Sequence, residues 1–477
     1  MSETTTGPWW RSDDAWAMLV AAGLLAAAWW CTVPVGEATA EPGQPAFRNL
    51  LTPWLATPGG WSTDPFQAFS GSTEPGGPSR ASAVAVTMAG CGLVLAVALA
   101  GVGVPPARSV PAVVGLVALA TLAWLVNGQS LNKLLQLEYV LWAFAGGLFV
   151  SNVIGTPAWL KPALRGELYI KTGLVLMGAS LLFGTLMKLG PPGILVSWVT
   201  TPIVLVATYL FGQRVLKIES RSLNLVLSAD MSVCGVSAAV ATAAACRAKK
   251  EELSIAIGIS LAFTVIMMFA LPMAIEAMGL DQVLAGAWIG GTVDSTGAVV
   301  AAGELVGPVA RDVAASVKLI QNVLIGVISL AVAAWWARTE DAGDTSGVAR
   351  RAATVTAGSI LAEIWRRMPK FVFGFIGASA LFTLLASSGP EGRDVAVATM
   401  LKGPVKMMQS WCFCLGFVSI GLETEVRRLA AAMGSWKPVA LYVCGQAFNL
   451  FLTFVMAWLA FRVIFPDVAA RLASGGG

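Results

Sequence analysis

The most informative absence in this 477-residue sequence is histidine, of which there is none. Without an imidazole the chain cannot use Ser-His-Asp or Cys-His catalysis, a histidine-ligated zinc or haem, or a histidine pH switch. HExxH and P-loop motifs are also missing, and the apolar segments hold no paired acids. We therefore predict a protein that is not an enzyme, binds no structural metal and needs no cofactor.

Charged residues are scarce as well, at 12% of the sequence against about 25% in soluble domains. Hydrophobic residues make up 56%, and the formal net charge of +4 is too small and scattered to suggest a nucleic-acid partner. The seven cysteines fall in apolar stretches, so we expect small buried side chains and no disulfide framework. This composition is typical of a polytopic membrane protein that has the lipid bilayer as a partner.

Apolar runs predict an all-α fold. A bilayer-crossing helix needs roughly 20 mostly apolar residues, and the sequence offers about 13 such segments. The first has a mixed-charge flank and is interpreted as an anchor and not as a cleavable signal peptide. The segments are 15–34, 82–104, 110–127, 138–156, 167–188, 192–212, 222–246, 253–278, 283–303, 311–337, 370–387, 404–422 and 437–463.

The distribution of Lys and Arg predicts a cytoplasmic amino terminus, because short cytoplasmic loops are enriched in these residues. With 13 crossings, the basic loops around Arg214 and the charged stretch 338–369 then lie inside, and the carboxyl terminus lies outside. One loop disagrees, since Arg247, Lys249 and Lys250 would lie outside. The disagreement draws attention to the segment that precedes this loop.

Two segments differ from ordinary spanning helices. The seventh contains Ser222–Thr242 and the twelfth runs over Lys402–Glu423, and both are rich in small and hydroxyl residues. Interrupted helices are tolerated at membrane depth only where they are buried in protein or line a watery cavity. The alternative is close packing of continuous helices through small residues.

The positions of these two segments indicate an internal duplication. Each is the fourth of five segments, in the runs 138–278 and 283–463, and a unit with an odd number of crossings inserts its second copy upside down. Paired interruptions in two halves indicate a transporter binding site. The predicted domains are 1–130 (three accessory helices and an extracytoplasmic loop), 131–280 and 281–465 (two inverted five-helix repeats, the second with the cytoplasmic loop 338–369) and 466–477 (a tail).

Charged residues inside apolar segments are costly and usually face a cavity or a partner. Asp230 lies in the seventh segment, Asp294 in the ninth, Lys318 in the tenth and Lys171 in the fifth. The alternatives are hydrogen bonds to neighbouring helix ends for the acids and, for Lys318, a side chain that extends to the interface.

These residues suit a midplane site for an anion, because inward-pointing helix amino termini supply N–H groups and positive half-dipoles. Asp230 and Asp294 would hold the coupling ion, a proton or Na+. Lys406 is a further candidate cation. The predicted substrate-binding residues are Ser232, Cys234, Gly235, Ser237, Thr292, Ser295, Lys318, Ser410 and Ser419.

The motifs SVCGVSAAVAT at 232–242 and GAWIGGTVDSTGAVVAAG at 286–303, with VSIGLET at 418–424 and GQAFNL at 445–450, make residues 130–463 resemble a known family. It is the sulfate exporter family of YeiH-type bacterial inner-membrane transporters. The resemblance implies two inverted five-helix repeats with crossed discontinuous helices, as in cation/proton antiporters and bile-acid symporters. Lys318 matches a family lysine, while Asp294-Ser295 replaces a family pair of histidine and acid.

Three functions are compatible with the sequence. The first is a secondary transporter that exports a small inorganic or sulfonated anion, with sulfate as the default, driven by a proton or Na+ gradient. The second is a cation/proton antiporter that uses Asp230 and Asp294. The third is an anion channel. A homodimer in the inner (plasma) membrane, with the extra amino-terminal helices as scaffold, is compatible with each of them.

Overall fold

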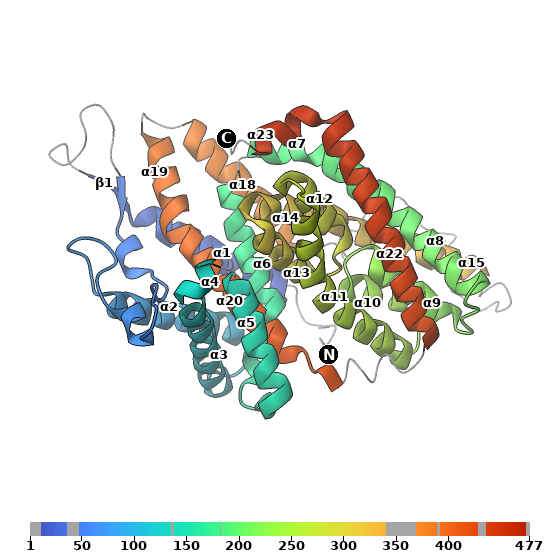
Figure 1. Ribbon diagram of the computed structural model, residues 1–477, viewed down its shortest axis with the longest axis horizontal. Helices are drawn as coiled ribbons and strands as arrows, with labels where there is room; N and C mark the ends of the chain where they lie inside the picture. The colour runs from blue at the N-terminus through green and yellow to red at the C-terminus, as the bar shows by residue number, and fades with distance from the viewer. Residues whose placement is uncertain are drawn as a thin grey trace. The chain divides into compact units, whose positions relative to one another are not determined.

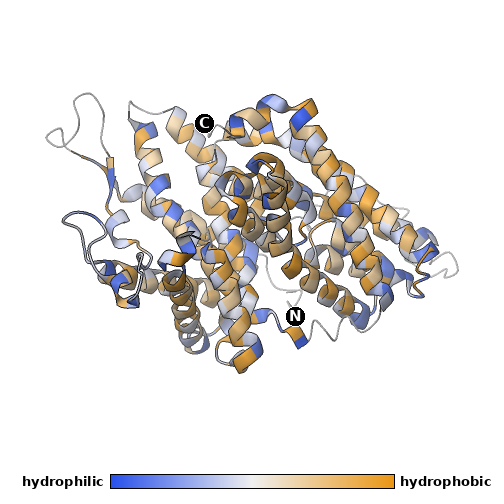
Figure 2. Cartoon of the chain, in the orientation of Figure 1, coloured by the Kyte–Doolittle hydropathy of each residue, from blue (hydrophilic) through white to orange (hydrophobic). Residues whose placement is uncertain are grey.

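The structure is a computed structural model that describes residues 11–35, 47–134, 138–181, 183–339, 369–388, 392–427 and 436–473. The chain divides into two compact units, residues 1–184 with 370–425 and residues 185–369 with 426–477 (Figure 1). Helices dominate both units, and their apolar stretches are bounded by polar residues at helix ends and connecting segments (Figure 2).

The first unit contains the amino-terminal helices. Its two short strands pair antiparallel, with Val33 opposite Arg48. Short 3-10 turns cover Thr52–Trp54, Pro65–Phe69 and Lys161–Ala163. The elements are α1 (Asp13–Trp30), β1 (Thr32–Pro34), β2 (Phe47–Asn49), α2 (Arg80–Val102), α3 (Pro106–Asn127), α4 (Ser130–Leu134), α5 (Tyr139–Phe149, extended by a π turn over Val150–Gly155), α6 (Gly166–Ser180), α18 (Phe371–Ser387), α19 (Arg393–Met400) and α20 (Lys406–Glu423).

The predicted interruption of the twelfth segment is wrong. A π turn at Leu401–Val405 joins α19 to α20, and the backbone stays helical from Arg393 to Glu423. The small residues of α20 serve close packing, which was the alternative: a Cβ at Gly421 would lie 2.4 Å from the Phe144 carbonyl oxygen of α5. A wider helical turn therefore accommodates Pro404 without breaking the helix.

The second unit holds the remaining helices, and the boundary between the units falls within α7. The fifth predicted segment, 167–188, ends early because Leu181 is extended after α6. The elements are α7 (Phe183–Ile194), a π turn (Leu195–Val199), α8 (Thr200–Arg214), α9 (Arg221–Ser232), α10 (Val236–Ala245), α11 (Lys250–Met278), α12 (Gln282–Thr292), α13 (Thr296–Val306), α14 (Pro308–Asn322), α15 (Leu324–Thr339), α22 (Trp436–Trp458), a π turn (Leu459–Ile464) and α23 (Pro466–Ala473).

The seventh predicted segment is interrupted, and its two halves form a hairpin. The hydroxyls of Ser220 and Ser222, at the start of α9, donate to the Glu252 carboxylate at 2.6 and 2.7 Å. Glu252 lies in the first turn of α11, which follows directly on α10. The start of α9 and the end of α10 therefore lie together, so the segment enters and returns on one side. We call α9–α10 the first hairpin.

The ninth predicted segment has the same construction. Gln282, the first residue of α12, accepts a hydrogen bond from the Val309 N–H at 3.1 Å, beside the end of α13. Both limbs pack on the same part of α14: a Cβ at Gly286 would lie 2.5 Å from the Ala310 carbonyl oxygen, and one at Gly303 would lie 2.6 Å from the Arg311 Cα. We call α12–α13 the second hairpin. Its 11-residue first limb spans about 16 Å, roughly half of a bilayer core.

The prediction of about 13 spans counts each hairpin as one crossing, whereas the two ends of each hairpin lie together at one end of the second unit. Among the described residues, seven helices are long and apolar enough to span a bilayer, and α10 and α13 are among the shorter apolar ones. Limbs of this kind need protein around them. All ten residues of α9 from Leu223 to Ser232 are buried, as are all ten of α12 from Val283 to Thr292.

Helix α22 accompanies both hairpins along the second unit (Figure 1). At one end the Lys437 ammonium donates to the Lys217 carbonyl at 3.1 Å, beside the open end of the first hairpin. At the other end Arg462 pairs with Asp281, the N-cap of α12, at 2.5 Å. The open ends of the two hairpins are therefore separated by the length of α22, and the hairpins enter the unit from opposite ends.

Several predictions lie wholly or partly outside the described residues. The charged loop 338–369 is described only at its two ends, and the loop 35–80 lacks 36–46. The domain boundaries near 130, 280 and 465 and the inverted five-helix repeats stay predictions.

Candidate functional site

The tips of the two hairpins meet inside the second unit. The first tip turns at Val233-Cys234-Gly235, where Gly235 has φ 66° and ψ −129°, a conformation that favours glycine. The second turns at Val293-Asp294-Ser295 through extended backbone. A Cβ at Gly235 would lie 3.3 Å from the Asp294 Cβ. The Gln321 amide joins the tips, because it donates to the Ser232 carbonyl at 3.1 Å and to the Gly291 carbonyl at 3.3 Å.

Side chains from α14 and α22 cap the helices that end at these tips. Lys318 donates to the Val233 carbonyl at 2.5 Å and to the Gln321 amide oxygen at 2.8 Å. Gln446 donates to the Thr292 carbonyl at 3.0 Å, and Asn449 donates to the Met231 carbonyl at 3.2 Å. The last carbonyl groups of a helix have no partner within it and carry partial negative charge. At both tips these groups are therefore satisfied by nitrogen donors.

The amino-terminal ends of α10 and α13 face the same region with different chemistry. The first N–H groups of a helix have no acceptor within it, and they favour anions. Ser295 caps α13, since its hydroxyl oxygen accepts from the Ala298 N–H at 3.1 Å. That bond uses the oxygen only, so the Ser295 O–H can still donate.

Two buried acids complete the cluster. Asp294 is 2% exposed and accepts a hydrogen bond from the Tyr442 hydroxyl of α22. Asp230 is fully buried, and the Ser260 hydroxyl of α11 is the hydrogen-bonding group beside its carboxylate. Asp294 and Lys318 are the charged groups that act electrostatically on Asp230. An ionised carboxylate is costly to bury, so the charge state of Asp230 depends on the groups around it.

Two comparisons with known proteins show the family to which this chain belongs. A family model described as conserved hypothetical protein 698 matches residues 111–441. The chain is 48% identical to a UPF0324 membrane protein of Rhodopirellula baltica, over 89% of this chain and 75% of that protein. The chain belongs to the UPF0324 membrane protein family.

Other UPF0324 relatives extend this similarity. A UPF0324 membrane protein of Nitratidesulfovibrio vulgaris is 48% identical over 82% of the chain and 66% of its own length. One of Nitrosomonas europaea is 29% identical over 73% of the chain and 72% of its own length. The chain thus spans about two thirds to three quarters of these relatives. No solved structure matches it.

In this UPF0324 protein, most of the predicted site residues gather at the hairpin tips. Two of the predicted hydroxyl donors are already used, because Ser232 donates to the Ser228 carbonyl and Thr292 donates to the Trp288 carbonyl at 2.7 Å. Ser237 is an exposed residue near the start of α10. The residues at the tips are Asp230, Ser232, Cys234, Gly235, Thr292, Asp294, Ser295 and Lys318.

Two predicted residues lie elsewhere in the UPF0324 chain. Ser410 and Ser419 belong to α20 of the first unit, in the continuous helix. Ser419 is fully buried there, against the close approach of Gly166. Their assignment followed from the predicted interruption of the twelfth segment. The second interruption instead lies in the ninth segment, which contains Asp294.

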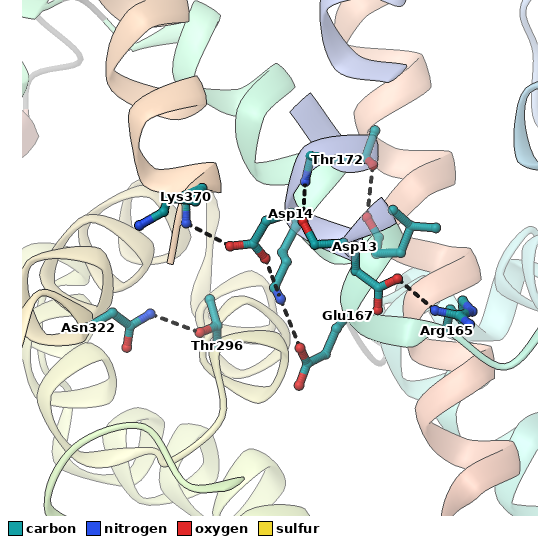
Figure 3. A network of polar contacts seen from close by, with 12 residues as sticks. Asp13, Asp14, Arg165, Glu167, Thr172, Thr296, Asn322 and Lys370 are labelled. Atoms are coloured by element: carbon teal, nitrogen blue, oxygen red, sulfur yellow. Dashed lines mark hydrogen bonds and ion pairs between the residues drawn. The ribbon is translucent and has the colours of Figure 1, made fainter. Parts of the chain in front are cut away.

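The sequence reasoning missed the contribution of α22. Tyr442, Gln446 and Asn449 contact one tip or the other, and two of them fall in the motif GQAFNL at 445–450. Polar residues at intervals of three and four along an otherwise apolar helix were the available signal. Asn322, which follows the cap residue Gln321, donates to Thr296 at 3.3 Å at the start of α13 (Figure 3).

Lys171, the other charged candidate, belongs to an ion-pair cluster in the first unit. Its ammonium group lies 2.9 Å from Asp14 of α1 and 2.9 Å from Glu167 of α6. The Lys370 backbone N–H donates to Asp14 at 2.7 Å, and Arg165 pairs with Asp13 at 2.8 Å (Figure 3). These bonds tie α1 and α6 to the start of α18, so Lys171 has a structural explanation.

Proposed function

We propose that this protein is a secondary transporter that moves a small anion across the bacterial inner membrane, with sulfate as the default substrate. The observation that carries the proposal is the meeting of two re-entrant hairpins, from opposite ends of one unit, in a buried polar cluster. Discontinuous helices that meet at the midplane are how many transporters build a site that each side of the membrane can reach in turn.

The pattern of satisfied groups favours an anion. Five backbone carbonyl groups at the helix ends accept hydrogen bonds from Lys318, Gln321, Gln446 and Asn449. Because these oxygens already have donors, they are less suited to bind a cation. The amino-terminal ends of α10 and α13 remain, with the Ser295 hydroxyl and the charge of Lys318 close by. Such a set of donors suits an oxyanion.

A cation/proton antiporter is the second candidate, because Asp230 and Asp294 are two buried acids in one cluster. In that case Asp230 and Asp294 would bind the cation and the protons in alternation. The two candidates differ in what competes for the site: an oxyanion in the first, Na+ in the second.

The hairpin geometry supports a cytoplasmic amino terminus. Because the first hairpin returns to the side from which it enters, the loop with Arg247, Lys249 and Lys250 lies beside Arg214 and Lys217. This removes the single disagreement with the charge rule. Removing two crossings leaves the sides of the two termini unchanged.

Proteoliposomes that contain the purified protein would test the proposal. We expect labelled sulfate to exchange for unlabelled sulfate with saturation, and sulfite, thiosulfate or a sulfonate to compete. Failure of sulfate to move, in exchange or under any imposed proton or Na+ gradient, removes sulfate as substrate. Flux that does not saturate would favour a channel, and Na+-for-proton exchange would favour the antiporter.

A matched pair of serines sharpens this test. Ser295→Ala removes a hydroxyl donor at the second tip, and we expect the half-saturating sulfate concentration to rise about tenfold, as a lost hydrogen bond of about 1.4 kcal/mol implies. Ser329→Ala is the control, because the Ser329 hydroxyl donates to the Gly326 carbonyl within α15. We expect the control to transport like the natural protein.

A further inference from the structure

The charges at the hairpin tips do not balance. Asp230, Asp294 and Lys318 are each at most 2% exposed, and together they carry a net charge of minus one when all are ionised. A divalent oxyanion would bring that total to minus three in a buried site, where uncompensated charge is costly.

Lys318 is poorly placed to compensate both acids. Its ammonium group donates to the Val233 carbonyl and to Gln321, and it makes no ion pair with either carboxylate among the described contacts. The other groups that face the acids add no positive charge: they are Tyr442 from α22 and Ser260 from α11, while Cys234 at the first tip acts on Lys318. Protons on the two carboxyl groups would supply the missing compensation without a further ligand.

From this geometry, and resting on the proposed function, we infer that each divalent oxyanion travels together with two protons, one on Asp230 and one on Asp294. The two protons raise the total at the tips from minus one to plus one, and the dianion returns it to minus one. The site then carries the same charge when empty and when loaded. Transport of the dianion is therefore electroneutral, and it responds to the pH gradient and not to the membrane potential.

Coupling to two protons also determines which gradients control the direction of dianion transport. Because no net charge moves, the combined gradients of anion and protons decide the direction. A cell whose dianion gradient exceeds the opposing proton gradient would release the dianion together with two protons. An acidic exterior would drive the same cycle inward.

The test uses the full chain in liposomes, with labelled sulfate as the probe, an internal pH dye and the potential clamped by K+ and valinomycin. We expect a pH gradient to drive sulfate toward the alkaline side with two protons per sulfate. We expect the rate to stay the same at clamped potentials of either sign. Sulfate flux that ignores the pH gradient, or that changes with potential, overturns the inference and leaves the proposed function standing. Absence of all sulfate movement, exchange included, overturns both.

Neutral variants separate coupling from folding. In Asp230→Asn and in Asp294→Asn, each of which removes one of the two proton sites, we expect one proton per sulfate in place of two, so that sulfate flux becomes sensitive to the clamped potential. Asp281→Asn is the control, because it removes an acid outside the tips and an asparagine can still cap α12. Exchange and proton drive that are both unchanged in the two tip variants would overturn the inference. If a variant fails to fold, the proton-to-sulfate ratio of the natural protein still decides.

Discussion

Each unit contains a cluster of charged residues, and the two clusters differ in whether their acidic and basic side chains form direct ion pairs. In the first unit, Lys171 lies 2.9 Å from each of two carboxylates, and Arg165 pairs with Asp13 (Figure 3). At the hairpin tips, the three charged side chains are more deeply buried, and Lys318 bonds a backbone carbonyl and an amide.

The difference separates a structural role from a functional one. Direct ion pairs fix α1 and α6 to the start of α18 without leaving a buried charge uncompensated. The hairpin tips keep their acids apart from their lysine, an arrangement that is unfavourable unless another ion or proton joins it. A buried cluster whose charges are not compensated by the protein itself is the better candidate for a ligand site.

The strongest test of this comparison replaces the two lysines. We expect Lys318→Met to lower sulfate transport about 100-fold, equivalent to about 2.8 kcal/mol, because the site loses the positive charge of Lys318. We expect Lys171→Met to lower the free energy of unfolding by about 2 kcal/mol, since Asp14 loses its ammonium partner and keeps the Lys370 N–H. Transport per folded molecule should persist in this second variant.

Flux in liposomes and thermal unfolding in detergent measure the two effects. A Lys171→Met protein that keeps its stability but loses transport would contradict the comparison, as would a Lys318→Met protein that transports normally.

A smaller effect is expected at the first tip. Gly235→Ala forces a side chain into a left-handed conformation beside Asp294, and we expect a loss of about 1–3 kcal/mol in stability together with impaired transport. Gly146→Ala in α5 is the control, because a Cβ there meets nothing within 4 Å. The control should be neutral or stabilised by about 0.5–1 kcal/mol. Equal melting temperatures of the two variants would argue against a constrained tip.

We expect removal of the Tyr442 hydroxyl to lower stability and transport less than Gly235→Ala does. Tyr442→Phe keeps the ring stacked on Phe263 and removes the donor to Asp294. We expect a loss of about 1–2 kcal/mol in unfolding free energy and a reduced proton drive on sulfate. Tyr209→Phe is the control for ring packing, because Tyr209 contacts Trp335 edge-on. Identical transport by both variants would show that Tyr442 acts only through packing.

The smallest perturbation tests the hairpins themselves. In a protein with its native cysteines replaced, Glu219→Cys and Lys250→Cys flank the first hairpin, and we expect an impermeant maleimide to label both from the same side. Met278→Cys, at the far end of α11, should react from the opposite side. Labelling of Glu219→Cys and Lys250→Cys from opposite sides would mean that α9–α10 crosses the membrane.

Part of this arrangement could be predicted from the sequence. The small and hydroxyl residues around Ser232 and Gly235 indicated the first interruption, and the scarcity of charge made Asp230, Asp294 and Lys318 prominent. These residues do come together. Basic residues at Arg247, Lys249 and Lys250 also drew attention to the seventh segment, because they disagreed with the charge rule, and that segment is the first hairpin.

The rest was hidden for physical reasons. Two apolar limbs of 11 residues and a short turn have the length of one spanning helix, so composition cannot separate a hairpin from a span. In the twelfth segment, the small residues serve close packing, and a π turn accommodates Pro404. Which partner a small residue faces depends on the fold and is invisible in a single sequence.

Helix α22 has a consequence for motion. It bonds the second tip through Gln446 and the first through Asn449, and it also reaches Asp281 and the Lys217 carbonyl at the two open ends. Neither hairpin can move away alone without breaking its hydrogen bonds or ion pair to α22 and the π turn that extends it. If access to the tips alternates between the two sides of the membrane, we expect the two hairpins and α22 to move together as one rigid body.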